Sequence, residues 1–337
     1  MRGKVSAMTQ EKMKEITYAQ AVAEAIDEEM ARDKDVVLIG EDVGIIGGNF
    51  KATVGLRDKY GDWRVKDTPI SENGIVGLGV GMAITGMRPI VEIMFGDFLA
   101  LAMDQIGNQA AKIRYMSGGQ VKVPLTIRTV IGAGRSSASQ HSQSLHAWCA
   151  HVPGLKVVMP STAAELKGLL KSAIRDDNPV VFLEHKIEYN KKFLVPTGEI
   201  LIPLGKANVV REGDALTIVG TSNMVTKSLE AAEALAKEGI NIEVIDLRTL
   251  VPMDTQTIIA SVKKTGRLLI VDEGHLSFGI GAEIGMRIME DVFYDLDYPM
   301  MRLGTADVPI PFSPALEFPI IPDVKKIYEK AKGMAKR

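Results

Sequence analysis

Short apolar segments alternate with longer amphipathic ones along most of this sequence, and this alternation constrains the fold more than any other feature. Segments such as DVVLIGED (35–42) and RPIVEIMFG (88–96) end in glycine or acidic residues and are typical of parallel strands buried on both faces. The segment TYAQAVAEAIDEEMARD (17–33) instead has apolar residues at helical spacing, with Thr17 at the position of an N-cap. Such alternation predicts an α/β protein with layered sheets and helices.

The same pattern divides the chain into two layered α/β domains. Strand and helix segments alternate up to PVVFLEH (179–185), which predicts a first domain over 16–188. A stretch with prolines, glycines and no sustained period follows and is interpreted as a linker over 189–206. A second strand and helix series predicts a domain over 207–337, and residues 1–15 are expected to be a flexible leader.

Charge and cysteine content exclude several classes of partner. A net charge of −2 and a pI near 6.3 offer no electrostatic surface for nucleic acid or an anionic membrane. The single cysteine, Cys149, cannot form an internal disulfide, and no apolar signal segment precedes the first helix. We therefore expect a cytoplasmic protein.

The segment TPISENGIVGLGVGMAITG (68–86) places one carboxylate, Glu72, ahead of several glycines. Its glycine spacing does not match the G-x-G-x-x-G of a dinucleotide-binding loop. A helix is predicted instead, with a smooth stripe at positions i, i+3 and i+7 that allows close packing or ligand contact. The stripe consists of Gly74, Gly77 and Gly81.

Two interpretations of Glu72 remain open at this point. Ser71 could cap the predicted helix, and Glu72 would then be a favourable charge in its first turn. Alternatively, Glu72 faces a flat heteroaromatic ring with a basic nitrogen, which would explain a carboxylate beside a slim apolar surface.

Histidine and cysteine side chains are the other candidates for chemistry. His141, His146 and His151 lie at five-residue intervals, which does not bring them together on a helix as the i, i+4 pair of a zinc site does. His141 is expected in a polar loop, as a surface residue or as a proton donor. Cys149 is expected to be a small buried hydrophobe, and His275 a loop residue or part of an interface or site.

Several segments together resemble one family, the β subunits of the thiamine-diphosphate-dependent first components of pyruvate, branched-chain 2-oxo acid and acetoin dehydrogenase complexes. The resemblance covers roughly 16–330 and implies a pyrimidine-binding domain followed by a transketolase C-terminal-type domain. The segments that carry it are TPISENGIVGLGVGMAITGMRPIVEIMFGDF, DQIGNQAAKIRYMSGG, QHSQSLHAW, PGLKVVMPST, KSAIRDDNPVVFLEHK, IEVIDLRTLVPMD and RLLIVDEGH.

The resemblance implies roles for individual residues. The family's catalytic glutamate matches Glu72 and hydrogen-bonds N1′ of the aminopyrimidine, so that the 4′-nitrogen can take the proton from thiazolium C2. Ile70, Met94 and Phe98 match the family's contacts to the pyrimidine, and Phe98 could stack on the ring. His141 matches the histidine that orients the substrate and donates a proton when the lipoyl group is acylated.

A structural potassium site is also implied by the resemblance. Its ligands in the family match Leu125, Ala173, Ile174, Asp176 and Asn178.

One motif of such enzymes is absent from the sequence. The chain contains no G-D-G sequence, which in the family binds magnesium and the diphosphate. The resemblance therefore implies a separate α subunit that supplies the Mg²⁺ site, in an α2β2 heterotetramer served by a lipoyl-bearing acyltransferase.

The substrate is less defined than the family. Three segments look closest to the acetoin-cleaving branch of the family, so acetoin is favoured as substrate slightly ahead of pyruvate, with branched-chain 2-oxo acids third. These segments are NQAAKIRYM, TIRTVIGAG and FLEHK. Two rival interpretations are a two-domain relative of a transketolase-like synthase such as deoxyxylulose-phosphate synthase, and a non-catalytic β-like partner. The QHSQS and IRDDNP segments argue against the first, and the presence of Glu72, Phe98 and His141 argues against the second.

Overall fold

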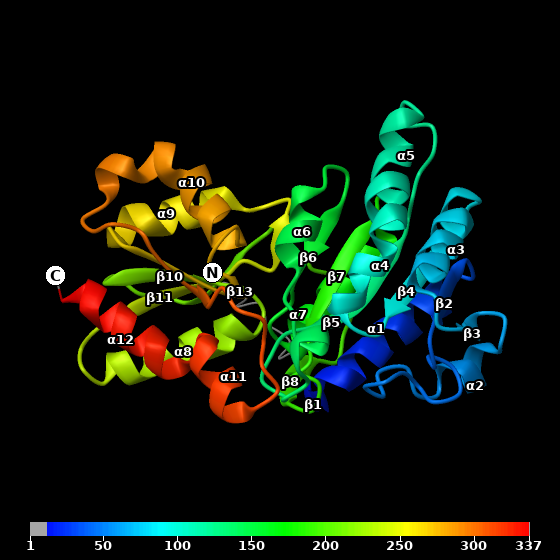
Figure 1. Cartoon of the computed structure of the whole chain (residues 1–337), viewed down its shortest axis with the longest axis horizontal. Coiled ribbons are helices and arrows are strands. Elements are labelled where there is room, and N and C mark those ends of the chain that lie inside the picture. Colours follow the sequence, from blue (N-terminus) through cyan, green and yellow to red (C-terminus); the bar gives the residue numbers. More distant parts are fainter. Residues whose placement is uncertain (1–11, 337) are drawn as a thin grey trace, which may run out of the picture.

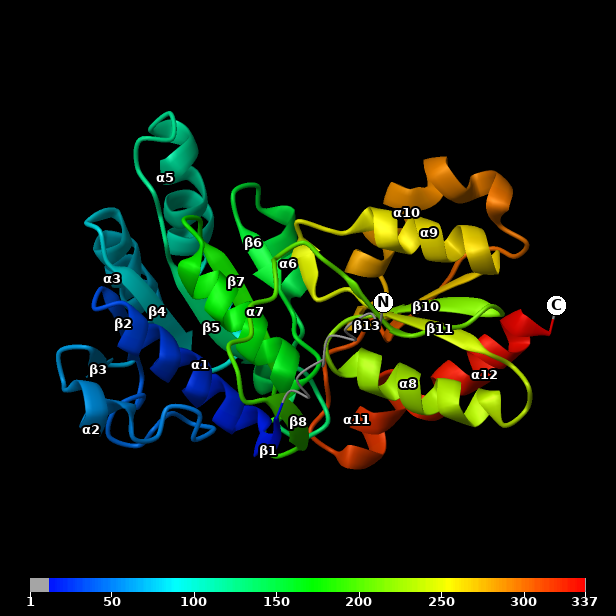
Figure 2. The same ribbon diagram turned by 180° about the vertical axis from the view of Figure 1, so that it is seen from behind.

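A computed structural model describes residues 12–336, which form two α/β lobes lying side by side (Figure 1). The first lobe spans residues 12–204 and the second spans residues 205–336. Seen from the opposite side in Figure 2, α1 and α7 lie across the sheet of the first lobe, while α8 and α12 lie below that of the second. The sequence therefore predicts the α/β class correctly.

The sheet of the first lobe has seven strands in the order β12-β6-β7-β5-β4-β2-β3. All neighbouring pairs from β6 to β3 are parallel, and only β12 at the edge is antiparallel. Parallel pairing explains the apolar runs, because helices cover both faces. The strands are β2 (Val36–Gly40), β3 (Val65–Asp67), β4 (Arg88–Ile93), β5 (Thr126–Ile131), β6 (Lys156–Val158), β7 (Val180–His185) and β12 (Thr249–Val251).

Helices cover the two faces of this sheet with separate hydrophobic clusters. Thr17 begins α1 with the predicted N-cap, because its side chain and that of Gln20 bond each other's backbone amides at 3.1 and 2.8 Å. One face carries α1 (Tyr18–Arg32) and α7 (Ala163–Arg175); the other carries α3 (Glu72–Ile84), α4 (Leu99–Met103), α5 (Ala111–Met116) and α6 (His146–His151), with α2 (Leu56–Tyr60) near β3.

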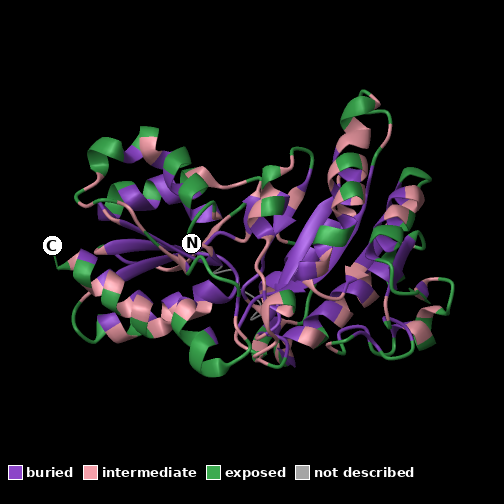
Figure 3. Ribbon diagram, viewed as in Figure 1, coloured by how far each residue is buried: buried purple, intermediate pink, exposed green. Residues whose placement is uncertain are grey.

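The second lobe has a five-stranded sheet in the order β14-β13-β10-β11-β9, with only β9 antiparallel. Its central strands β10, β11 and β13 are buried, its edge strands β9 and β14 are only partly buried, and its helices expose their outer sides (Figure 3). The elements are β9 (Asn208–Arg211), β10 (Leu216–Gly220), α8 (Asn223–Ala236), β11 (Ile242–Asp246), α9 (Thr255–Thr265), β13 (Leu268–His275), α10 (Ile280–Val292), β14 (Met301–Thr305), α11 (Pro314–Ile320) and α12 (Val324–Ala335).

Three features differ from the pattern in the sequence. The segment 97–119 has apolar residues at the spacing of one long helix ended by Gly118 and Gly119, but a π-helical segment, Asp104–Ala110, interrupts it. The expected linker (189–206) contains β8 (Lys192–Pro196), which pairs antiparallel with β1 (Met13–Thr17). Part of the expected leader (1–15) thus belongs to a strand, and its residues 1–11 lie outside the described part of the chain. These pairings are long-range contacts, which periodicity does not record.

The two lobes are joined by a strand and by a shared core. β12 follows β11 of the second sheet but pairs with β6 of the first. One hydrophobic cluster runs from the α3 face of the first lobe through Leu247 and Leu250 to α9 and α10. No helix of the described residues is long and apolar enough to cross a membrane.

Candidate functional site

The residues expected to contact a cofactor all lie beyond the carboxyl ends of strands in the first sheet. Ile70 and Glu72 follow β3, Met94 and Phe98 follow β4, and His141 follows β5. These strands belong to one parallel run, so their carboxyl ends share one edge. Ligands of open α/β sheets bind outside this edge.

Glu72 is the first residue of α3 and only 7% of its surface is exposed. Within residues 12–336, no group donates a hydrogen bond to its carboxylate, and Ser71 at the N-cap makes no capping bond through its side chain. Ser71 therefore occupies the N-cap position, but the predicted capping bond is not formed. The Glu72 oxygens are not among the fully buried atoms that lack a partner, so solvent reaches them and a ligand N–H can take the place of water.

A second carboxylate, Glu41, lies near Glu72. Glu41 follows β2, the neighbour of β3. Burial raises the pKa of Glu41, and the charges of Glu72 and Asp42 raise it further. Two carboxylates thus lie at this edge, and the pKa of Glu41 is above its ordinary value in part because of the charge of Glu72.

The glycines of α3 serve two different contacts. Gly79 faces the sheet, where an added Cβ would lie 2.5 Å from Cγ2 of Val91. Gly81, at the end of the predicted stripe, has no atom within 4 Å of the corresponding position, and Gly74 is exposed. Within this chain the ends of the stripe are thus open to a partner, whereas Gly77 at its centre packs against Gln105.

Three rings pack edge to face beside the end of β4. The His141 imidazole lies 4.8 Å from the Phe95 ring and 5.4 Å from the Phe98 ring, measured between centroids. Met94 is half-buried, whereas Ile70 is 81% exposed. The structure therefore brings Phe98 and His141 together and leaves the Ile70 side chain uncovered by this chain.

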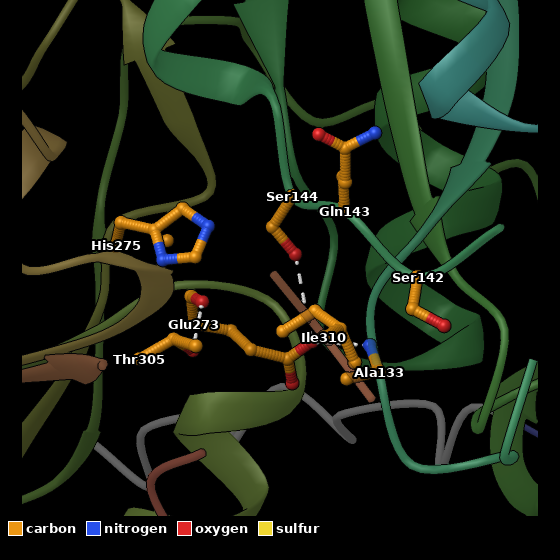
Figure 4. Close-up of a pocket in the computed structure, with 9 residues that line it drawn as sticks. Ala133, Ser142, Gln143, Ser144, Glu273, His275, Thr305 and Ile310 are labelled. Atoms are coloured by element: carbon orange, nitrogen blue, oxygen red, sulfur yellow. Dashed lines mark hydrogen bonds between the residues drawn. The ribbon is translucent and has the colours of Figure 1, made fainter. Parts of the chain in front are cut away.

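The loop after β5 that carries His141 contacts the second lobe through Glu273 of β13. The Glu273 carboxylate accepts hydrogen bonds from the Ala133 amide at 2.7 Å and the Ser144 hydroxyl at 3.4 Å, and it pairs with His185 at 3.0 Å (Figure 4). Burial alone raises the pKa of Glu273, but His185, Lys227 and the Ala133 amide outweigh it and lower the pKa to about 2.

The remaining histidines lie in separate surroundings. His146 is buried and its Nε2 lies 2.9 Å from Asp272 of the second lobe. Burial lowers the pKa of His146, but the Asp272 charge outweighs it and the pKa is raised. His151 is exposed, and His275 lies beside the cavity in Figure 4, with its Nδ1 2.8 Å from the Ala306 carbonyl oxygen.

Cys149 is buried, as predicted. Burial raises the pKa of its thiol to about 12. It is therefore uncharged and inaccessible at neutral pH, which confirms the interpretation as a small hydrophobe.

The expected potassium ligands lie at the opposite edge of the same sheet. They precede β5, lie in the last turn of α7 or lie between α7 and β7: Leu125, Ala173, Ile174, Asp176 and Asn178. The carbonyl oxygens of Ile174 and Asp176 both lie 3.1 Å from Arg88 Nη1. Several oxygen atoms thus converge here, as a hard cation requires, but a guanidinium already contacts two of them.

Other residues at the site lack a motif. Glu41 and Lys186 directly follow β2 and β7, so the strand-end rule could have identified them. Phe95 lies near the end of RPIVEIMFG (88–96), the segment that is typical of a buried strand. Glu273 and Glu317 come from the second lobe, and no local signal in the sequence places them beside the His141 loop.

Comparisons with known proteins agree with this architecture. Residues 14–192 match the family described as "Transketolase, pyrimidine binding domain", and residues 205–327 match "Transketolase, C-terminal domain". A split-gene transketolase, solved as an inactive β4 tetramer, shares the fold with a TM-score of 0.77 and 23% identity, over 95% of this chain and 98% of that one.

Curated relatives are similar along almost the whole chain. The mitochondrial pyruvate dehydrogenase E1 component subunit β of Dictyostelium discoideum is 49% identical over 96% of this chain and 92% of its own length. The pyruvate dehydrogenase E1 component subunit β of Rhizobium meliloti is 47% identical over 96% of this chain and 70% of its own length.

The low pKa of Glu273 predicts a pH-dependent contribution to stability. Because its folded pKa of about 2 lies below the ordinary glutamate value of 4.5, the contribution is complete above pH 4.5 and is lost as pH falls toward 2. In urea unfolding, the difference in free energy between wild type and Glu273→Gln should be constant above pH 5. The same difference in unfolding free energy should be about 1.4 kcal/mol smaller at pH 3.5. A difference that does not vary between pH 6 and 3.5 would contradict this.

Proposed function

The chain belongs to the family of pyruvate dehydrogenase E1 β subunits, and from this we propose that it forms one half of a thiamine-diphosphate site that acts on pyruvate. The observation that carries the proposal is Glu72, a nearly buried carboxylate with no donor from the described residues, at the carboxyl edge of the sheet. An aminopyrimidine offers that carboxylate a ring N–H donor. When bound, thiamine diphosphate supplies a carbon nucleophile that adds to the substrate carbonyl.

Glu72 would hold the proton of the ring nitrogen N1′. A carboxylate that has left water is a stronger hydrogen-bond acceptor than an exposed one, so it favours the imino form of the ring. Glu41 stands nearby as a second carboxylate. Phe98 and Met94 supply apolar surface at the end of β4, where a flat ring can pack against a phenyl face.

His141 would orient the substrate and donate a proton during acyl transfer to a lipoyl group. Its imidazole is half-buried and packs by its edge against Phe95 and Phe98. These contacts restrain the plane of the ring. Such a restrained, partly exposed imidazole suits proton transfer.

The diphosphate half of the site would come from an α subunit in an α2β2 heterotetramer. The chain has no G-D-G sequence, and no group of three acidic, histidine or cysteine side chains suited to a metal occurs within residues 12–336. Mg²⁺ would therefore bind on the α subunit. The open ends of the α3 stripe, Gly74 and Gly81, are places where a second backbone can approach closely. A lipoyl acyltransferase would collect the acyl group.

Potassium would bind between α7, β5 and β7 at the other edge of the sheet. Asp176 and Asn178 are adjacent, since Asn178 Nδ2 donates to Asp176 Oδ1 at 2.8 Å, while Asn178 Oδ1 accepts from Arg114 Nη1 at 2.6 Å. Arg88 would have to release the Ile174 and Asp176 carbonyls, and Arg114 the Asn178 oxygen. The cation would be structural, since this edge lies away from Glu72.

Reconstitution with the α subunit from the same source tests the shared site. The β chain alone and the α chain alone should each show no thiamine-dependent dye reduction with pyruvate, and the mixture should be active. Robust turnover by the β chain alone would contradict the proposal. Acetoin and 2-oxoisovalerate should be turned over more slowly than pyruvate, and a faster reaction with acetoin would assign the chain to the acetoin branch.

Substitution of Glu72 tests the cofactor contact. In the reconstituted enzyme, Glu72→Ala should lower the dye-linked rate by about 100-fold or more, because the ring nitrogen loses its acceptor. Glu329→Ala, which removes an exposed carboxylate of α12, is the matched control and should be neutral. A Glu72→Ala enzyme with near-normal rates would exclude the assigned role.

Substitution of His141 separates the two half-reactions. His141→Ala should lower lipoyl-linked acyl transfer by about 100-fold or more and dye-linked turnover much less, because the donated proton is needed only in the former. His151→Ala, at an exposed histidine, serves as control. Equal losses in both assays would argue against a specific role in acyl transfer.

A further inference from the structure

The loop between β5 and α6 is held in a conformation that its sequence does not favour. Two of its non-glycine residues, Ser136 and Ala138, have positive φ angles of 52° and 62°. Each such residue costs of order 1–3 kcal/mol and persists only where surrounding contacts fix it. His141 lies three residues after Ala138, so whatever fixes this backbone also fixes the imidazole.

Glu317 of the second lobe supplies the strongest of these contacts. It is fully buried in α11. Its Oε1 accepts from the Gly134 amide at 2.7 Å, and its Oε2 accepts from the Ser136 amide at 3.0 Å. The two oxygens thus bind the backbone amides of the residues on either side of Arg135, and both amides precede the strained residue Ala138. Hydrogen bonds to an ionised carboxylate are about twice as strong as neutral ones.

Two further residues of the second lobe bind the same loop, Glu273 at its beginning and end and Ile310 in its middle. Glu273 accepts from the Ala133 amide and the Ser144 hydroxyl (Figure 4). The Ile310 carbonyl oxygen accepts from the Ser139 hydroxyl at 2.7 Å. The loop is therefore attached to β13, to α11 and to the segment before α11.

The first lobe contacts the loop closer to His141. Lys186 Nζ donates to the His141 carbonyl oxygen. Asp97 Oδ1 accepts from the Gln143 amide at 3.1 Å and its side chain at 2.9 Å. Since Asp97 lies in sequence between Phe95 and Phe98, these bonds hold the end of the loop beside the two rings that touch His141, while the second lobe holds its earlier part.

We propose that Glu317, assisted by Glu273, is a positioning residue for His141, so that the second lobe sets the geometry of the acyl-transfer step. The inference rests on the role proposed above for His141. It gives the second lobe a function at the active site in addition to any role in assembly. A displacement of α11 would change acyl transfer while leaving Glu72 and the first half-reaction unaffected.

Hydrogen exchange tests the attachment without reference to catalysis. Glu317→Gln has nearly the shape of glutamate, but its NH₂ group cannot accept from a backbone amide, so one of the two bonds is lost. In the reconstituted enzyme, amide exchange across 132–145 should become about tenfold faster or more. Glu329→Gln, the same change at an exposed site of α12, should leave it unchanged. Unaltered exchange in Glu317→Gln would overturn the proposal.

Kinetics then test the link to His141. Glu317→Gln should lower lipoyl-linked turnover about tenfold more than dye-linked turnover, with the KM for pyruvate retained. In the background of His141→Ala it should cause no further loss, because it acts through that residue. An additive loss would overturn the positioning role.

A second variant provides a test of the attachment that does not depend on the folding of Glu317→Gln. Ser139→Ala removes only the hydroxyl bond to Ile310 and should give smaller changes in the same direction in both measurements. No change in either would overturn the proposal if Glu317→Gln does not fold. Normal acyl transfer by His141→Ala would overturn the proposed function and the catalytic part of this inference, whereas the exchange result would still report whether Glu317 holds the loop.

Discussion

The parallel pairing of β3, β2, β4, β5 and β7 is the constraint on which the site depends. Because each strand runs in the same direction, the chain leaves the sheet at one edge after every strand. Residues that are far apart in sequence, such as Glu72, Phe98 and His141, are thereby collected at that edge. The residues expected to bind potassium precede β5 and β7 and so lie at the other edge, where a cation can only stabilise the structure.

Buried charges link the loops at this edge to the rigid sheet. Arg128 in β5 donates to both oxygens of Glu184 in β7 at 2.7 and 2.8 Å, and to Glu92 in β4 at 2.6 Å. Each of these charges is costly to bury alone and is tolerated because its hydrogen bonds are nearly complete. The carboxylates of Glu273 and Glu317 are likewise buried and hydrogen-bonded, in this case across the lobe interface, where they accept from backbone amides of the His141 loop. Loops that would be mobile on their own thus acquire one conformation.

Glu72 departs from this principle, and the departure indicates function. The other buried carboxylates of the site have donors within the chain, whereas the described residues supply none to Glu72. A family of two-chain enzymes offers a consistent explanation, because a cofactor held between subunits would provide the donor. The open ends of the α3 stripe, Gly74 and Gly81, fit a site that is completed by a second chain.

The sequence by itself determined the class of fold, most strands and helices, the Thr17 cap and the burial of Cys149, because these follow from local periodicity and hydrophobicity. Through its motifs it also indicated the family and the candidate residues Glu72, Phe98 and His141. Only the tertiary structure decided that β12 joins the first sheet, that β8 pairs with β1, and that Glu273 and Glu317 hold the His141 loop. The physical reason is that these contacts join segments distant in sequence. A carboxylate's partner depends on how the two lobes pack, and local sequence carries no record of that packing.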